Sequence, residues 1–136
     1  MNIPFAISAR TAHLIGMENF ANAEGAIVEL VKNAYDADAD TCVVVADVRE
    51  NKAESKLFII DNGSGMTDEI IIKHWMTIGT DDKLLNTRSS NKKRVKRGAK
   101  GIGRFALNRL GASAEMLSFA CSELDKGYVW NVDWKK

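Results

Sequence analysis

The sequence predicts an α+β domain in which a layer of helices covers one face of a mixed, mostly antiparallel sheet. Two observations support this prediction. Apolar residues recur at helical spacing in one long segment, and short runs rich in β-branched residues occur elsewhere. The expected order is helix, helix, strand, strand, helix, basic loop, helix and hairpin, which suits helices packed on a sheet. A chain of 136 residues has the size of one domain, so we treat residues 1–136 as a single unit.

Two helices are expected before the first strand. Residues 8–16 form a short one. In the second, Asn22 can cap the first turn and Glu24 lies in that turn, where a negative charge is favourable. The apolar positions of the second helix are Ile27, Leu30, Val31 and Ala34. This helix should end within residues 36–40.

Four strands are expected, and they form two pairs along the chain. Residues 41–48 and 56–60 are short and rich in β-branched residues, which favours strand over helix. Residues 114–121 and 128–134 are expected to form a hairpin around the turn at residues 125–127.

Two more helices and a loop complete the expected fold. Thr67 caps a helix that reaches about Trp75. Residues 104–110 form a short helix that ends at Gly111. Between them, residues 79–97 form a long polar segment without periodicity, which is typical of a lid.

Composition indicates an ordinary globular protein, with 46% apolar and 27% charged residues. The longest apolar run, residues 41–46, is far shorter than the roughly 20 residues that cross a bilayer. We therefore expect a cytoplasmic protein without membrane contact. Cys42 and Cys121 lie in strand-like stretches and are expected to be buried, reduced thiols. His13 and His74 stand alone, which favours structural roles.

The net charge of +1 hides one strongly basic segment. Nine basic residues and no acid lie between Lys83 and Arg104, whereas the other 10 basic residues are outnumbered by 18 acids. This segment is suited to contact anions.

Glu29, Asn33 and Asp36 fall within an arc of about 60° on the second helix, at about 100° per residue. Taken alone, such a face is most simply the solvated side of an amphipathic helix. It can also carry chemistry, because an asparagine is a neutral oxygen ligand and a glutamate one turn away can orient a water.

Asp61 follows an apolar strand and is itself followed by Gly63 and Gly65. The simplest interpretation is a turn, because glycine permits positive φ. Glycines also let a flat ring approach the backbone, and a carboxylate can accept a hydrogen bond from the amine of adenine. A calcium loop is disfavoured, because the alternating acidic ligands and closing glutamate of that pattern are missing.

Glycines at positions 98, 101 and 103 lead directly into a helix. Backbone N–H groups and the positive end of the helix dipole then point toward one place, which favours phosphate. The motif is neither a P-loop nor a Rossmann turn, whose glycine spacings differ. A flexible hinge for the lid is compatible with this function.

In this order, the three motifs resemble those of the GHKL ATPases (gyrase, heat-shock chaperone, histidine kinase and MutL). Residues 29–38 resemble the N box, residues 61–65 the first glycine box and residues 98–103 the second. The resemblance extends from about residue 8 to residue 120 and is closest to prokaryotic ATP-binding proteins related to MORC, MutL and the heat-shock chaperones. It implies a Bergerat fold, a two-layer sandwich that holds nucleotide between helices and a lid.

The resemblance also implies a role for each matching residue. Glu29 would be the general base or water-orienting group, Asn33 the Mg²⁺ ligand, and Asp61 the acceptor for the adenine amine. Gly63 and Gly65 would line the base pocket. The full set expected to bind ATP, besides Glu29, is Asn33, Asp36, Asp61, Gly63, Gly65, Met66, Gly98, Lys100, Gly101, Ile102 and Gly103.

The expected function is Mg²⁺-dependent binding and hydrolysis of ATP, coupled to closure of residues 79–97 and to formation of a homodimer. Two alternatives stay open: a histidine-kinase-like catalytic domain, and an ATP-regulated module that contacts DNA through the basic run at residues 92–97. No phosphoacceptor-histidine helix precedes the site, and the basic run lacks interleaved aromatic residues. Both alternatives therefore rank below ATP hydrolysis.

The resemblance implies further chain beyond Lys136. GHKL ATPases continue into a strand whose threonine completes the adenine pocket, and then into a second domain that contributes a lysine to the γ-phosphate. We therefore expect residues 1–136 to be the N-terminal portion of a longer protein, with the ATP-binding domain incomplete at its C-terminus.

Overall fold

The computed structural model describes Leu14, Glu18, residues 22–75, Ser89, Asn91, Lys92, Arg94, Val95 and residues 105–134. Its elements are α2 (Ala23–Asp36), β1 (Cys42–Asp47), η1 (Lys52–Glu54), β2 (Lys56–Asp61), α3 (Asp68–Ile70), η2 (Ile71–Trp75), α5 (Ala106–Leu110), β3 (Ser113–Ser118) and β4 (Tyr128–Asp133). The helix expected over residues 8–16 lies outside the described residues, apart from Leu14.

Helix α2 begins where the sequence predicts. The Asn22 side chain accepts a hydrogen bond from the backbone N–H of Gly25 at 2.8 Å, which satisfies one of the free donors of the first turn. The buried stripe is Ala26, Leu30 and Ala34. The prediction that Val31 belongs to this stripe was wrong, because its exposed fraction is 37%. Small alanines therefore form much of the packed face.

The core joins this stripe to the sheet and to α5. Ala26, Leu30 and Ala106 form its buried centre, and Ile59 of β2 packs against them together with Leu107 and Leu110 of α5. Close approach of the helices needs small side chains, and Ala26 and Ala106 supply them, both with an exposed fraction of 0%. This packing fixes α2 against β2.

The four predicted strands are confirmed as two antiparallel pairs. In the β1–β2 pair, Cys42 lies opposite Asp61 and Asp47 lies opposite Lys56. In the β3–β4 pair, the register starts with Ser113 opposite Asp133 and ends with Ser118 opposite Tyr128. The second pair forms the predicted hairpin, although β3 stops three residues before Cys121.

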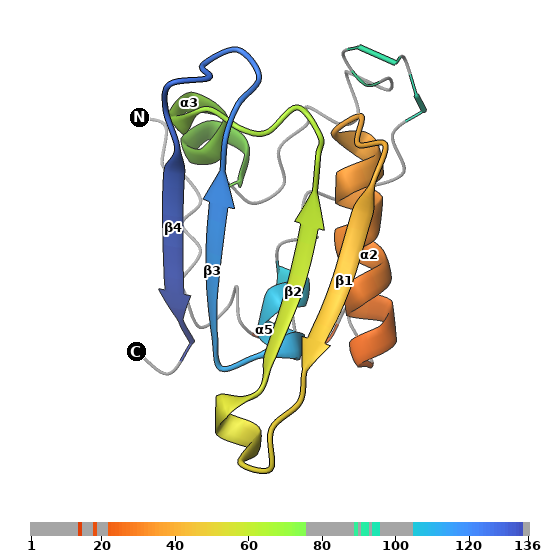
Figure 1. Ribbon diagram of the computed structural model, residues 1–136, viewed down its shortest axis with the longest axis vertical. Coiled ribbons are helices and arrows are strands. Elements are labelled where there is room, and N and C mark those ends of the chain that lie inside the picture. The colour runs from red at the N-terminus through yellow and green to blue at the C-terminus, as the bar shows by residue number, and fades with distance from the viewer. Residues whose placement is uncertain are drawn as a thin grey trace, which may run out of the picture.

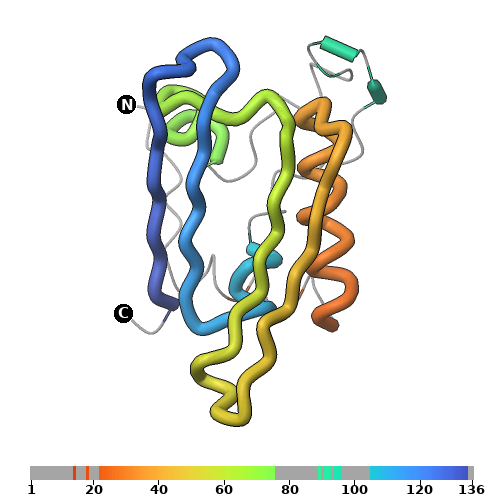
Figure 2. Tube along the Cα trace, viewed as in Figure 1, coloured from red at the N-terminus to blue at the C-terminus, as the bar shows by residue number. Residues whose placement is uncertain are grey.

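Figures 1 and 2 show the two strand pairs side by side in the order β4, β3, β2, β1, with α2 and α5 on one face. Neighbouring strands β2 and β3 point the same way in Figure 1, as in a mixed sheet, but backbone ladders in the described residues join only β1 to β2 and β3 to β4. After β2 and β3 end, one further backbone hydrogen bond joins the two segments, from the N–H of Cys121 to the carbonyl of Ser64 at 2.9 Å. Helices with antiparallel strands confirm the α+β class.

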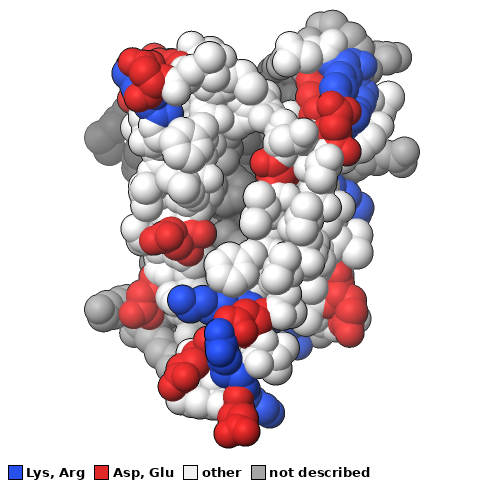
Figure 3. Space-filling model, in the orientation of Figure 1, with Lys and Arg blue, Asp and Glu red and all other residues white. Residues whose placement is uncertain are grey.

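The face of the strands opposite the helices is largely apolar. Figure 3 shows few charged side chains in its middle and most of them at the two ends. Register pairs Val43 with Ile60, Val45 with Phe58, and Leu117 with Val129 on this face, and all six side chains are exposed.

The remaining predicted helices are present with altered ends. Thr67 caps α3, with its hydroxyl 3.4 Å from the backbone nitrogen of Ile70, and the chain continues to Trp75 as the π-helical turn η2. The Trp75 ring packs edge-on against Trp130, with centroids 6.3 Å apart. Helix α5 ends before Gly111, whose N–H donates to the carbonyl of Leu107 at 3.1 Å. Within the described residues, no helix is long and apolar enough to span a membrane.

The prediction of two buried thiols was wrong for Cys121, which is exposed, whereas Cys42 is partly buried. The physical reason is that the chain leaves β3 at Ser118 and turns toward the Gly63–Gly65 loop, so Cys121 no longer lies in a strand. Its thiol is 3.8 Å from the carbonyl oxygen of Gly63.

Candidate functional site

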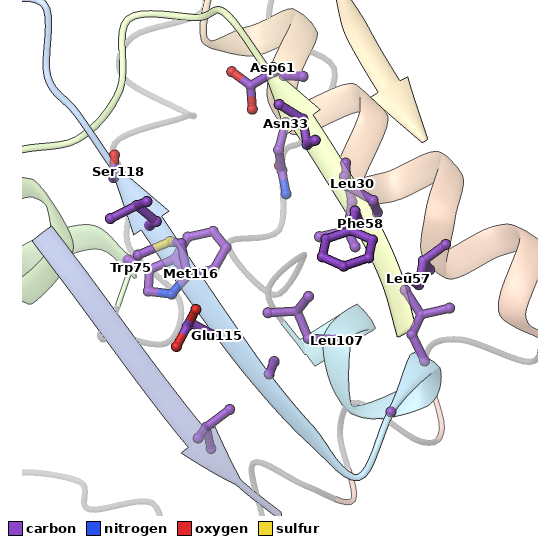
Figure 4. A pocket seen from close by; sticks show the side chains of 18 of the residues that line it. Leu30, Asn33, Leu57, Phe58, Asp61, Trp75, Leu107, Glu115, Met116 and Ser118 are labelled. Carbon is purple, nitrogen blue, oxygen red and sulfur yellow. The ribbon is translucent and has the colours of Figure 1, made fainter. Parts of the chain in front are cut away.

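A pocket lies between the helix layer and the strands, and its polar end is formed where α2, β2 and β3 finish. Its volume of about 2350 Å³ exceeds the roughly 300–1,000 Å³ of typical small-molecule sites. Its lining combines apolar residues of β2, β3 and α5 with polar residues at the end of α2 and in the turn after β2. Figure 4 shows Asn33 and Asp61 near each other at the polar end, and Leu57 and Leu107 toward the other.

The turn after β2 is locked onto the end of α2. Asp61 Oδ1 accepts from the backbone N–H of Gly63 at 2.9 Å, and the N–H of Ser64 donates to the carbonyl of Ala37 at 2.8 Å. A Cβ atom at Gly63 would lie 2.8 Å from the Ala37 oxygen, so only glycine permits this approach. The turn therefore holds Asp61 beside the last turn of α2.

Gly65 makes a second close approach, to the end of β3. Its φ is +66°, and a Cβ atom there would lie 1.9 Å from the carbonyl oxygen of Phe119. The next residue, Met66, donates its N–H to Ser118 Oγ at 2.8 Å. The two glycines thus allow the chain to pass tightly between α2 and β3, which explains their spacing in structural terms.

Asn62 was not among the predicted site residues, yet it holds this turn in place. Its side-chain oxygen accepts from the backbone N–H groups of Asp40 and Thr41, each at 2.9 Å. These bonds tie the start of β1 to the turn. The Asp-Asn-Gly composition indicated a turn, but the partners lie about twenty positions earlier in the chain and cannot be read from local spacing.

The structure brings six predicted site residues to one pocket, because all of them are among its lining residues: Asn33, Asp36, Asp61, Gly63, Gly65 and Met66. The Asp61 side chain is exposed and thus accessible to a ligand. The second glycine loop lies outside the described residues, and with it Gly98, Lys100, Gly101, Ile102 and Gly103.

Glu29 is not among the described residues that line the pocket. It lies one helical turn before Asn33 on α2, and its carboxylate is 3.5 Å from the Lys32 ammonium. The Glu29 side chain is 22% exposed and that of Lys32 is 45% exposed. Lys32 is exposed, so this pair within one helix contributes little, roughly 0–1 kcal/mol, and holds the carboxylate only weakly.

Cys42 lies opposite Asp61 at the start of the β1–β2 ladder. Burial, together with the negative charge of Asp61, raises the pKa of the Cys42 thiol above its usual value of 9.0. The group therefore stays a neutral thiol near pH 7 and behaves as a small apolar side chain beside the turn.

Part of the basic segment contacts the protein itself. Lys92 pairs with Asp40, and the guanidinium of Arg94 lies 4.8 Å from the centre of the Tyr35 ring. Lys92 is exposed and meets an anionic carboxylate of the protein itself, whereas Arg94 is partly buried against Tyr35. The acids at the end of α2 and at the start of β1 attract them.

Comparison with known proteins shows the family. A family model described as histidine kinase-, DNA gyrase B- and HSP90-like ATPase matches residues 21–136. No curated protein matches the chain. The chain belongs to this family of ATPases, the GHKL superfamily, because the match covers most of its length. It is thus a nucleotide-binding domain of the ATPase class.

Proposed function

We propose that the protein binds ATP with Mg²⁺ at the Asn33–Asp61 end of the pocket and hydrolyses it. One observation carries the proposal: the turn after β2 is locked onto the end of α2, so that Asp61 and Asn33 line the same pocket. Membership of the ATPase family supports nucleotide binding in general.

Asp61 is proposed to recognise adenine. A carboxylate has two oxygens and about four acceptor sites, and the hydrogen bond from the Gly63 N–H occupies only one of them. The exposed remainder can accept the exocyclic amine of the base. Gly63 and Gly65 offer bare backbone beside it, where a flat ring can lie close.

Asn33 is proposed to bind the Mg²⁺ that accompanies ATP. The described residues contain no group of three or more His, Cys, Asp or Glu that could hold a metal ion. A single amide oxygen fits Mg²⁺ nevertheless, because this ion keeps several waters and takes further ligands from phosphates. When bound, it would neutralise charge on the transferred phosphoryl group. Asp36 follows Asn33 on the same helix and would support the position of its side chain.

Glu29 is proposed to orient or deprotonate the attacking water. It precedes Asn33 by one turn, so α2 carries both the metal ligand and the base. Its weak surface pair with Lys32 leaves it able to turn toward the pocket. Phosphate binding is assigned to the backbone around Lys100–Gly103, as the resemblance implies.

The remaining proposals rest on the sequence and on the resemblance. They are closure of residues 79–97 over bound ATP, ATP-dependent pairing of two copies, closer kinship to MORC, MutL and chaperone-type ATPases, and a cytoplasmic location. Contact between the basic segment and DNA is a weaker proposal, because Lys92 and Arg94 already have acidic and aromatic partners.

Replacing Asn33 with alanine tests the metal assignment. We expect the wild-type protein to bind a non-hydrolysable ATP analogue at least tenfold more tightly with Mg²⁺ than without it, since the ion bridges phosphate and protein (about 1.4 kcal/mol per factor of ten). Asn33→Ala should remove most of this difference. Isothermal titration calorimetry with and without EDTA measures it.

The matched control is Asn51→Ala in the β1–β2 connection, where the side chain accepts from the Ala53 N–H at 3.2 Å. This variant should keep the full Mg²⁺ effect. An Asn33→Ala protein with the same Mg²⁺ dependence as wild type would show that Asn33 is not the ligand.

A further inference from the structure

Asp38, just after α2, has an unusual backbone conformation. Its φ of +64° is the only positive value at a non-glycine residue in the described part of the chain. This left-handed region is unfavourable for most side chains, although aspartate tolerates it when its carboxylate makes local hydrogen bonds. Asp38 is also buried, with an exposed fraction of 7%. A buried carboxylate in a disfavoured conformation calls for specific partners.

Those partners come from the basic segment. Asp38 Oδ2 accepts from the backbone N–H of Asn91 at 2.8 Å. Burial alone would raise the pKa of the Asp38 carboxyl, but hydrogen bonds from Ser89 and the backbone of the basic segment, with the charge of Arg94, lower it below 3.8. The carboxylate is therefore ionised at neutral pH, and its hydrogen bonds are charge-assisted.

Arg94 attaches the same segment to the end of α2. Its Nη1 donates to the carbonyl of Ala39 at 2.7 Å, and its guanidinium lies over the ring of Tyr35. Nη2 is 3.7 Å from Asp40 Oδ1. Aromatic stacking and a planar fork of donors are properties of arginine that lysine lacks.

Electrostatic attraction also favours the contact between the basic segment and the end of α2. The last turn of α2 contains no basic residue, although cations are favourable at the carboxyl end of a helix. Arg94 and Lys92 bring positive charge to that end from more than fifty positions away in the chain. The hydrogen bond and charge of Lys92 also lower the pKa of Asp40 below its usual value.

The segment attached in this way includes a residue of the pocket lining, Ser89. The N–H of Ser89 donates to the carbonyl of Arg94, and the N–H of Arg94 donates to Ser89 Oγ, both at 2.8 Å. Ser89 is buried, with an exposed fraction of 2%, and it lines the pocket together with Asp36 and Asp38. Contacts at the end of α2 thereby fix one part of the pocket wall.

We propose that Asp38 and Arg94 are positioning residues that anchor Ser89, Asn91 and Lys92 to the end of α2 and so build the pocket wall beside Asp36. This inference rests on the proposed ATP site. The anchor sets nucleotide affinity and leaves the chemical step unchanged, since neither residue is placed on the reacting atoms.

Two variants remove the anchor without straining the fold. Asp38→Gly deletes the carboxylate, and glycine accepts φ of +64° more readily than aspartate. Arg94→Ala deletes the guanidinium. Matched controls are Asp125→Gly in the exposed β3–β4 turn and Lys73→Ala, which breaks an exposed ion pair with Glu69.

The first measurement is trypsin cleavage after Lys92 and Arg94, made without nucleotide and followed by mass spectrometry. For Asp38→Gly both sites are monitored, and for Arg94→Ala only Lys92. We expect cleavage to be several-fold faster than in wild type and the controls, because cleavage needs the local chain to open. Unchanged cleavage would overturn the anchor whether or not ATP binds.

The second measurement is the affinity for an ATP analogue together with KM and kcat. We expect affinity to fall about tenfold, as for one lost charge-assisted contact, with KM raised and kcat unchanged. Asp38→Asn should restore most of the affinity, because asparagine keeps the acceptor and tolerates this backbone. Faster cleavage with unchanged affinity would overturn the positioning role. A wild-type protein that binds no ATP analogue would instead refute the proposed function. The cleavage rates would still show whether Asp38 and Arg94 anchor the segment.

Discussion

Glu29→Ala is expected to lower phosphate release from ATP by a factor of about 10² to 10⁴, the usual contribution of a positioned general base. Affinity for ATP should change little, because adenine and phosphate contacts are assigned to other residues. The effect should therefore fall on kcat. Phosphate release under saturating ATP, with analogue binding measured in parallel, separates the two.

Lys32→Ala is the matched control for Glu29. It removes the ammonium that lies 3.5 Å from the Glu29 carboxylate but leaves the carboxylate in place. Release of Glu29 from this pair should keep turnover at the wild-type rate or raise it slightly. Turnover that survives Glu29→Ala unchanged would remove Glu29 from the catalytic step.

Gly65→Ala should destabilise the fold by about 3 kcal/mol or more, near the top of the range for single substitutions. Two effects add. Alanine is strained at φ of +66°, and its Cβ atom would lie 1.9 Å from the carbonyl oxygen of Phe119. The obstacle is backbone, so relief requires a shift of either the turn or the residues after β3. Urea unfolding followed by tryptophan fluorescence measures the loss.

Gly111→Ala is the control for that substitution. Gly111 has an extended backbone with φ of −160°, and the nearest atom to a new Cβ would be the Ser113 oxygen at 3.2 Å. A small adjustment accommodates it, and alanine restricts the unfolded chain, so the change should stay within about 1 kcal/mol. Equal stability of the Gly65 and Gly111 variants would contradict the close approach of the turn to β3.

Local features of the fold were predictable from sequence because their causes are local. The Asn22 cap and the β-branched strands each act over a few residues, and both are present. The connection between β3 and β4 turns earlier than the predicted residues 125–127, because its backbone hydrogen bonds join Glu123 to Ala120 and Lys126 to Glu123. Which side of α2 is buried was not predictable in this way. It depends on which small residues meet α5, and Ala26 and Ala106 come from segments far apart in the chain.

The candidate site likewise has features with local causes, which were predictable, and contacts between distant residues, which were not. The spacing of Asp61, Gly63 and Gly65 indicated a tight turn open to a ligand, and the turn is present. The partners that its two glycines approach most closely are protein backbone at Ala37 and Phe119. Asp38 and Asn91 are in contact but lie 53 positions apart in the chain. No periodicity or motif in the sequence indicates a contact between residues so far apart.

Recognition of the adenine of ATP by Asp61 can be tested by exchanging its carboxylate for an amide. Asp61→Asn keeps an oxygen for the Gly63 N–H, so the turn should persist, but it removes the charge that strengthens a bond to the adenine amine. Wild type should bind an ATP analogue in preference to the GTP analogue, and Asp61→Asn should weaken ATP binding by about ten- to a hundredfold with an unchanged melting temperature. Equal affinity of the two proteins for the ATP analogue, at equal stability, would contradict the claim.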